Sequence, residues 1–186
     1  MRLFVAIPVS QMVREYAAAI RSELEQSRPD VKWVEAQNYH LTLKFLGEVK
    51  ADNLKAIQAK LQMAAQACPP FGLETRGVGF FPNSNRPRVI WAGIRGEMDK
   101  SEFLGERIDT YLAELGFDPE KKRSFHLTLG RVRSELGLKE LCLKTAGVNK
   151  CCETISFPVD RFLLMVSKLT PRGPQYSILE SYFLEG

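Results

Sequence analysis

Two histidines are the residues best suited to acid–base chemistry in this chain, and they stand in identical surroundings. The sequence has only two, His40 and His126, and each begins the tetrapeptide His-Leu-Thr-Leu. With 22 leucines and 7 threonines in the chain, a second matching copy arises by chance roughly once in two thousand cases. A single histidine on a strand is usually a core or surface residue, but packing alone would not demand two copies. We therefore interpret the pair as a functional repeat.

The spacing inside each tetrapeptide has a structural meaning. Successive side chains of a β-strand point to opposite faces of the sheet. His40 and Thr42 therefore share one face while the two leucines anchor the other, and His126 and Thr128 follow the same pattern. If the two halves of the chain are related by a pseudo-twofold axis, the two polar pairs can face each other across a cleft.

Two imidazoles and two hydroxyl groups suit attack on a phosphodiester. Because the ordinary pKa of imidazole is ~6.5, one ring can be neutral and the other charged near pH 7. The neutral ring can then take a proton from water while the charged ring gives one to the leaving oxygen. The threonine hydroxyls can donate to the non-bridging oxygens, on which negative charge builds in the transition state.

Composition and cysteine usage limit the alternatives. The chain has 186 residues, 45% of them hydrophobic and 26% charged, and a net charge of +4 that suits a phosphate-bearing ligand. We expect no metal and no cofactor, because the cysteines form no C-x-x-C pair and the histidines lie far apart. We expect a cytoplasmic protein with reduced thiols, no targeting signal and no membrane attachment, since no apolar run approaches the ~18 residues of a span. The four cysteines are Cys68, Cys142, Cys151 and Cys152.

The pattern of apolar residues and turn signals predicts an α+β fold with mixed or antiparallel sheets and helices outside them. Strands are expected at 3–7, 31–35, 39–46, 71–81, 88–95, 125–132, 154–167 and 175–184. Helices are expected from a Ser10 cap to about Gln26, from an Asp52 cap to the prolines at 69–70, from about Ser101 to Gly116 with Phe103 buried, and near 135–145. A helix precedes each histidine motif, which indicates two lobes that each donate one copy of the motif strand.

Residues close to the motifs are candidates for substrate contacts. Arg131, five positions after the second histidine, would suit a phosphate; strict alternation puts it on the leucine side, although a bulge at Gly130 could re-aim it. Phe45, at the same offset in the first copy, could stack on a base or belong to the core. Strict alternation places Lys44 on the same strand face as His40. There it would add positive potential, or it is a lysine exposed to solvent. Four more basic residues in turn-rich or strand-end segments could rim the cleft: Arg86, Arg88, Lys168 and Arg172.

These motifs make the sequence resemble the 2H phosphoesterases, named for two H-x-[ST] motifs, and among them the RNA 2′,3′-cyclic phosphodiesterases once described as 2′-5′ RNA ligases. The similar segments are HLTLKFLGE at 40–48, HLTLGRVR at 126–133, the opening RLFVAI, RPRVIWAGI at 86–94 and the closing PQYSILESYFL. One departure is Phe125, because the family often has proline before the second histidine.

The resemblance implies one domain over 1–186 made of two intertwined lobes related by a pseudo-twofold axis. Two mainly antiparallel sheets would face a central cleft, with helices outside. It also implies hydrolysis of the 2′,3′-cyclic phosphate of RNA ends or nucleotides to a 2′-phosphate, with His40 as proton donor and His126 as proton acceptor. Thr42 and Thr128 would hold the phosphate, and the family pattern favours an arginine at Arg131.

Two alternatives remain at this level. The same residues would catalyse the reverse joining of ends through a 2′,5′ linkage, so the sequence does not give the physiological direction. A non-catalytic module that binds RNA ends belongs to a different class, and the presence of both histidines favours the enzyme. Nothing in the sequence demands an oligomer, and we expect a monomer.

Overall fold

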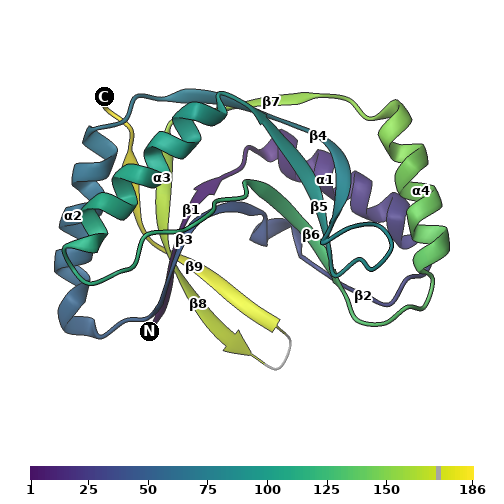
Figure 1. The fold of residues 1–186 in the computed structure, drawn as a ribbon, viewed down its shortest axis with the longest axis horizontal. Coiled ribbons are helices and arrows are strands. Elements are labelled where there is room, and N and C mark those ends of the chain that lie inside the picture. Colours follow the sequence, from purple (N-terminus) through teal and green to yellow (C-terminus); the bar gives the residue numbers. More distant parts are fainter. Residues whose placement is uncertain (171–172) are drawn as a thin grey trace.

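The strands form two separate sheets (Figure 1). The computed structural model describes residues 1–170 and 173–186, and every strand pairing within them is antiparallel. The first sheet has the order β3-β1-β8-β9 and consists of β1 (Arg2–Pro8), β3 (His40–Glu48), β8 (Arg161–Thr170) and β9 (Gly173–Phe183). The second has the order β2-β6-β5-β4-β7 and consists of β2 (Val31–Trp33), β4 (Phe71–Phe81), β5 (Val89–Gly96), β6 (His126–Val132) and β7 (Ile155–Val159).

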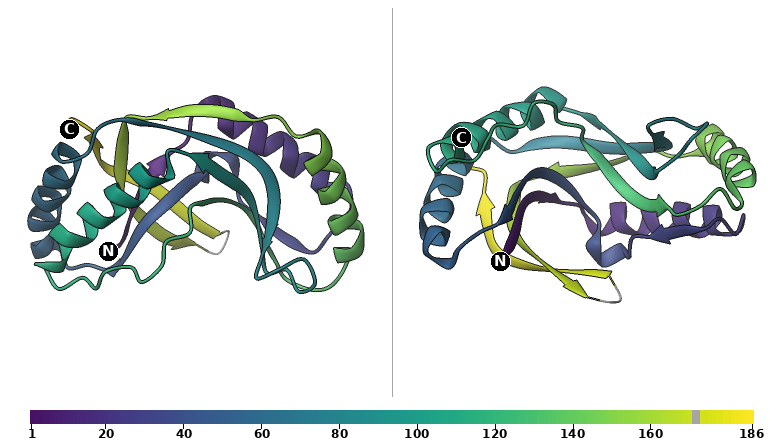
Figure 2. Two further views of the ribbon diagram at one scale, coloured as in Figure 1. Left: turned by 45° about the horizontal axis from the view of Figure 1, so that its top comes forward. Right: turned by 60° about the horizontal axis from the view of Figure 1, so that its bottom comes forward.

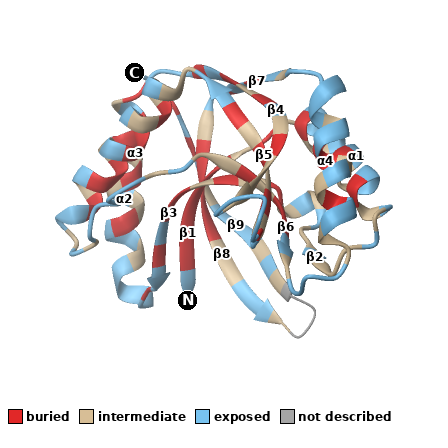
Figure 3. Cartoon of the chain, turned by 45° about the vertical axis from the view of Figure 1, so that its right-hand side comes forward, coloured by how far each residue is buried: buried red, intermediate tan, exposed pale blue. Residues whose placement is uncertain are grey.

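Two pairs of helices cover the outer sides of these sheets. The helices are α1 (Gln11–Glu25), α2 (Leu54–Gln66), α3 (Met98–Ala113) and α4 (Leu138–Cys151). Helices α2 and α3 pack together beside the first sheet, and α1 and α4 pack together beside the second (Figures 1 and 3). The expected α+β class, with two lobes and helices on the outside, is confirmed.

The chain crosses between the lobes in the same way in both halves. With the short strand β2 set aside, the order β1-α1-β3-α2 in the first half is repeated as β5-α3-β6-α4 in the second. In each half, the helix before the motif strand packs on the opposite lobe, because β3 belongs to the first sheet and β6 to the second. The turned views in Figure 2 show both lobes, with the β8–β9 hairpin reaching out from the first sheet.

Strand β1 forms the centre of the first lobe and one wall of the cleft. All residues from Leu3 to Ile7 are buried, because the strand lies between β3 and β8 and is covered on both faces. One face joins the main core under the helices. The other face, with Phe4 and Ala6, forms a small separate cluster against which Tyr176 packs.

Helix boundaries are partly as predicted. The Ser10 hydroxyl accepts a hydrogen bond from the Val13 backbone N–H at 3.3 Å, which confirms the first cap. The Asp52 cap is wrong, because a 3₁₀ turn occupies Ala51–Asn53 and α2 begins only after it, at Leu54. The fourth helix begins at Leu138 and extends past 145 to Cys151.

Two further expectations are corrected. Helix α3 begins at Met98, and its buried stripe runs through Leu104 at helical spacing, which leaves Phe103 39% exposed. The single strand expected at 154–167 is two strands in different sheets, since the chain crosses between lobes at Asp160. No helix in the described ranges is long and apolar enough to cross a membrane. All four cysteines are free thiols.

Candidate active site

Both histidine strands carry a bulge at the same point. The pairing of β3 with β1 skips Leu43, and the pairing of β6 with β5 skips Leu129. A bulge shifts the residues behind it by one position relative to the pleat. The fourth residue after each histidine therefore turns into the core and the fifth turns outward. The burial patterns of the two strands are the same over these six positions.

All six predicted site residues line one cleft. Strands β3 and β6 come from different sheets and lie against each other. Beside them lies a cavity of 420 Å³ lined by His40, Thr42, Phe45, His126, Thr128 and Arg131. Phe45 is 65% exposed, so the alternative of a core role for it is wrong. The bulge before Arg131 re-aims this side chain to the histidine face, against strict alternation.

Lys44 is buried, whereas strict alternation along the strand places it on the same face as His40. Its side chain is only 2% exposed, and its ammonium group donates to Asp109 Oδ1 at 2.6 Å and to the Asp118 carbonyl oxygen at 2.5 Å. Asp109, on α3, also pairs with Arg123 and accepts the Glu120 backbone N–H at 3.0 Å. One buried carboxylate thus connects the first motif strand to the segment that leads into the second.

The two histidine rings are oriented by equivalent hydrogen bonds. The Nδ1–H of His40 donates to the carbonyl oxygen of Asn38, two residues earlier, at 2.7 Å. The Nδ1–H of His126 donates in the same way to Ser124, also at 2.7 Å. Because a carbonyl oxygen can only accept, these bonds place the proton of each neutral ring on Nδ1. In each ring Nε2 is then the nitrogen that can gain or lose a proton during a reaction.

Aromatic rings pack against both histidines and restrict them further. The His40 ring lies 5.0 Å from Phe4 and 5.3 Å from Tyr176, measured between centroids. The His126 ring meets Phe81 nearly edge-on at 5.0 Å. The threonine hydroxyls, in contrast, have no hydrogen-bond partner in the described part of the chain, so they are free to donate to a ligand.

Comparison with known proteins agrees with this geometry. The family model of LigT-like phosphoesterases matches residues 7–91 and 100–176. The chain belongs to this family. It is 37% identical to a protein of Archaeoglobus fulgidus, with 98% of this chain and 99% of that one covered, and 35% identical to one of Thermotoga maritima, with 100% and 97% covered. Both relatives carry the name RNA 2′,3′-cyclic phosphodiesterase.

A solved structure shows the same architecture. The crystal structure of a protein from Thermus thermophilus superimposes with a TM-score of 0.82 at 29% identity, covering 100% of this chain and 99% of that one. This LigT-like phosphoesterase therefore has the same two-lobed fold as an experimentally determined structure.

Sequence reasoning missed several residues around the cleft. Arg2, Lys32 and Glu35 line it, so the cleft has an excess of positive charge together with Arg131. No sequence motif includes these positions. Arg2 could have been found only from the alternation of side chains along β1, counted from its buried neighbours. The rim residues expected at Arg86, Arg88 and Lys168 line neither this cavity nor the second one beside His126, and Arg172 lies outside the described residues.

The cleft lowers the proton affinity of both rings. Burial lowers the pKa of His40 below its ordinary value, and the charges of Arg14 and His126 lower it further, against the hydrogen bond to Asn38. Burial likewise lowers the pKa of His126, helped by Arg131. Both rings of this LigT-like phosphoesterase are therefore mainly neutral at pH 7. No three or more His, Cys, Asp or Glu side chains among the described residues lie together as a metal site.

Proposed function

We propose that this LigT-like phosphoesterase is an RNA 2′,3′-cyclic phosphodiesterase that hydrolyses a terminal cyclic phosphate to a 2′-phosphate. The observation that carries the proposal is the matched pair of histidine–threonine strands, each with a bulge that turns a fifth residue into the same cleft. The names of the relatives support the same substrate class. The free cysteines support a cytoplasmic location, and we keep the expectation of a monomer.

The reaction needs one proton taken and one proton given. His126, as a neutral ring, takes a proton from water at Nε2 while the water oxygen attacks phosphorus. The bond from phosphorus to the 3′-oxygen breaks, and His40, as a charged ring, gives this oxygen its proton. Thr42 and Thr128 donate to the non-bridging oxygens, and Arg131 balances their charge.

Two further features of the cleft fit a nucleotide. The exposed ring of Phe45 offers a face on which a base can stack. The excess of positive side chains attracts the phosphate before binding. A 5′-hydroxyl that takes the place of water would give its proton to His126 and attack the phosphorus of the cyclic phosphate, while the 3′-oxygen leaves with a proton from His40. This step forms a 2′,5′ linkage, so 2′-5′ joining of RNA ends belongs to the proposal as a second reaction of the same site.

The deciding experiment is incubation of the purified protein with an RNA that ends in a 2′,3′-cyclic phosphate. We expect complete conversion to a 2′-phosphate end, identified by phosphorus NMR or by resistance to a 3′-specific phosphatase. A 3′-phosphate product would contradict the proposed leaving group. Tight binding without turnover would instead identify a module that binds RNA ends.

Metal independence is tested in the same assay. We expect EDTA to leave the rate unchanged, because the proposed acid, base and phosphate ligands are all side chains of this chain. Loss of activity in EDTA with recovery on addition of zinc or manganese would overturn the two-histidine mechanism.

The pH dependence of the rate follows from the lowered pKa values. The reaction requires one neutral and one charged ring, so kcat/KM should be bell-shaped in pH, with limbs that belong to the coupled pair. Because burial lowers both pKa values in the free enzyme, this bell should centre on the acidic side of ~6.5. A bound phosphate anion stabilises imidazolium and raises both pKa values, so the bell in kcat should move to higher pH. A profile that is flat through neutral pH would argue against histidine catalysis.

A further inference from the structure

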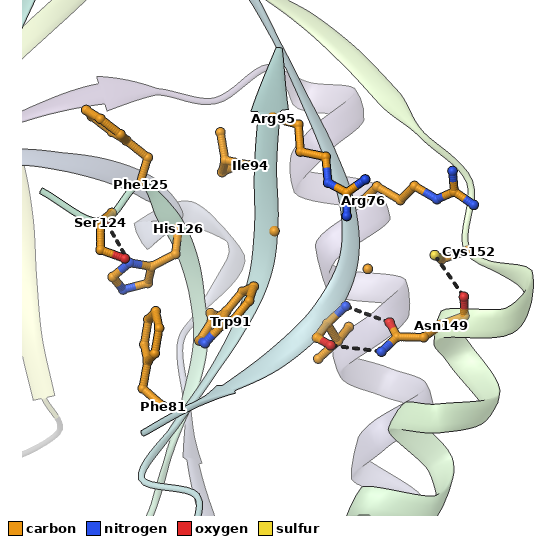
Figure 4. A pocket seen from close by; sticks show the side chains of 13 residues that line it. Arg76, Phe81, Trp91, Ile94, Arg95, Ser124, Phe125, His126, Asn149 and Cys152 are labelled. Atoms are coloured by element: carbon orange, nitrogen blue, oxygen red, sulfur yellow. Dashed lines mark hydrogen bonds between the residues drawn. The ribbon is translucent and has the colours of Figure 1, made fainter. Parts of the chain in front are cut away.

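A second cavity shares the His126 wall with the cleft, and the proposed reaction does not use it. Its volume is 720 Å³, within the ~300–1,000 Å³ range typical of small-ligand sites. The remaining walls come from β4, β5 and the end of α4 (Figure 4). In that view Arg76 and Arg95 lie at one side, and His126 with Phe81 and Trp91 at the other. A ligand that extends from the cleft past His126 would enter this space.

Two glycines let the sheet beside the cavity pack closely. At Gly93 an added Cβ atom would lie 2.7 Å from the Arg76 carbonyl oxygen, so no larger residue fits there. At Gly79 it would lie 2.3 Å from the Trp91 indole, which covers the bare backbone. The indole is in this way pressed onto the sheet beside Phe81, with ring centroids 5.0 Å apart.

A braced bulge presents Arg76 to the cavity. The pairing of β4 with β5 is irregular between Thr75 and Val78, where Gly77 has a φ of +74°. Such a bulge re-aims the residues that it carries. The side chain of Asn149 on α4 braces it, because its Oδ1 accepts the Val78 N–H at 2.7 Å and its Nδ2 donates to the Val78 carbonyl oxygen at 2.9 Å.

The charge of the cavity is uncompensated. Arg76 and Arg95 are exposed, and within residues 1–170 and 173–186 neither makes an ion pair or a side-chain hydrogen bond. No aspartate or glutamate lines the cavity. Two free guanidinium groups favour a ligand with phosphate oxygens. Cationic groups combined with an aromatic wall are the features by which proteins hold single-stranded nucleic acid.

We propose that this second cavity binds the RNA chain on the 5′ side of the cyclic end, with Arg76 and Arg95 as ligands of its backbone phosphates. The inference rests on the proposed function and adds that the substrate is an oligonucleotide rather than a mononucleotide. The terminal phosphate reacts in the cleft, and the preceding nucleotides pass His126 along the wall of Phe81 and Trp91. The double variant Arg76→Ala/Arg95→Ala should weaken binding of the preceding nucleotides and leave binding of the terminal phosphate unchanged.

The test compares 2′,3′-cyclic AMP with oligoadenylates of two and four nucleotides that end in a cyclic phosphate. In the wild-type enzyme kcat/KM should rise with length. In the double variant we expect the value for the tetranucleotide to fall roughly tenfold or more for each arginine removed, while 2′,3′-cyclic AMP reacts as before. The salt dependence of log kcat/KM for the tetranucleotide should become shallower by roughly 1.4, or ~0.7 per phosphate on a single strand.

A charge-matched control removes two exposed lysines from the other lobe. Lys50→Ala/Lys55→Ala loses the same charge near the start of α2 and should leave every substrate unaffected. An equal loss on the mononucleotide and the tetranucleotide in the arginine variant would overturn the proposal, and so would a wild-type enzyme without length dependence. If the wild-type enzyme turns over neither substrate, the proposed function itself fails.

Discussion

The His40→Ala enzyme should recover much of its lost rate when sulfur replaces the 3′-oxygen of the cyclic phosphate. On the oxygen substrate, removal of either ring should cost roughly 10²–10⁴-fold, the usual contribution of a general acid or base. A thiolate leaves almost without a proton, because the pKa of a thiol is ~8.5. The variant that lacks the acid is therefore the one that sulfur rescues. The measurement is single-turnover hydrolysis of both substrates at one pH.

His126→Ala is the matched control for this assignment. It should stay slow on both substrates, since the attacking water still needs its base. The two rings have equivalent hydrogen bonds to carbonyl oxygens two residues earlier, so the ground-state geometry makes either ring competent for either role. Rescue of His126→Ala instead would reverse the roles. Rescue of neither variant would mean that both rings mainly stabilise charge.

Replacement of Asp109 by asparagine should destabilise the fold by about 3–5 kcal/mol, the usual cost of breaking a buried ion pair from one side. Lys44 and Arg123 would keep their charges in the interior without their shared carboxylate. The free energy of unfolding is read from urea titrations, in which the midpoint should fall at an unchanged slope. Because Lys44 follows Thr42 by two positions and Arg123 precedes His126 by three, the folded fraction should also lose activity.

A surface ion pair between α2 and the end of α3 provides the control. Lys60 on α2 and Glu114 after α3 are 2.5 Å apart, but the glutamate side chain is 59% exposed. Glu114→Gln should cost under about 1 kcal/mol, since exposed pairs are screened by water. An equally small effect of Asp109→Asn would show that the buried network does not hold the two motif strands together.

The placement of the six site residues shows how far local pattern reaches. Alternation along a strand placed each histidine with its threonine and each pair of leucines opposite, and the structure has this arrangement. The same rule failed from the fourth residue onward, where Lys44 is buried and Phe45 is exposed. The glycine at 130 gave a local hint of a bulge, but the first copy has lysine at the equivalent place and gave none.

Helix positions show a similar limit. The Ser10 cap depends on residues within one turn of the start of α1, and it was predicted correctly. The crossing at Asp160 was not, because a continuous run of strand-forming residues contains no signal that its two parts join different sheets. The partner strands, which lie far away in sequence, decide where such a run divides.

The sequence by itself determined the reactive groups of the candidate site: two imidazoles and two hydroxyls, repeated at a spacing that a strand presents on one face. The tertiary structure decided which further residues join them. A bulge depends on how two strands register, so only the pairing of β3 with β1 and of β6 with β5 brought Phe45 and Arg131 to the cleft. The second cavity likewise lies where the bulge of β4 faces β5 and α4 braces that bulge. These are contacts between distant segments, which no local pattern encodes.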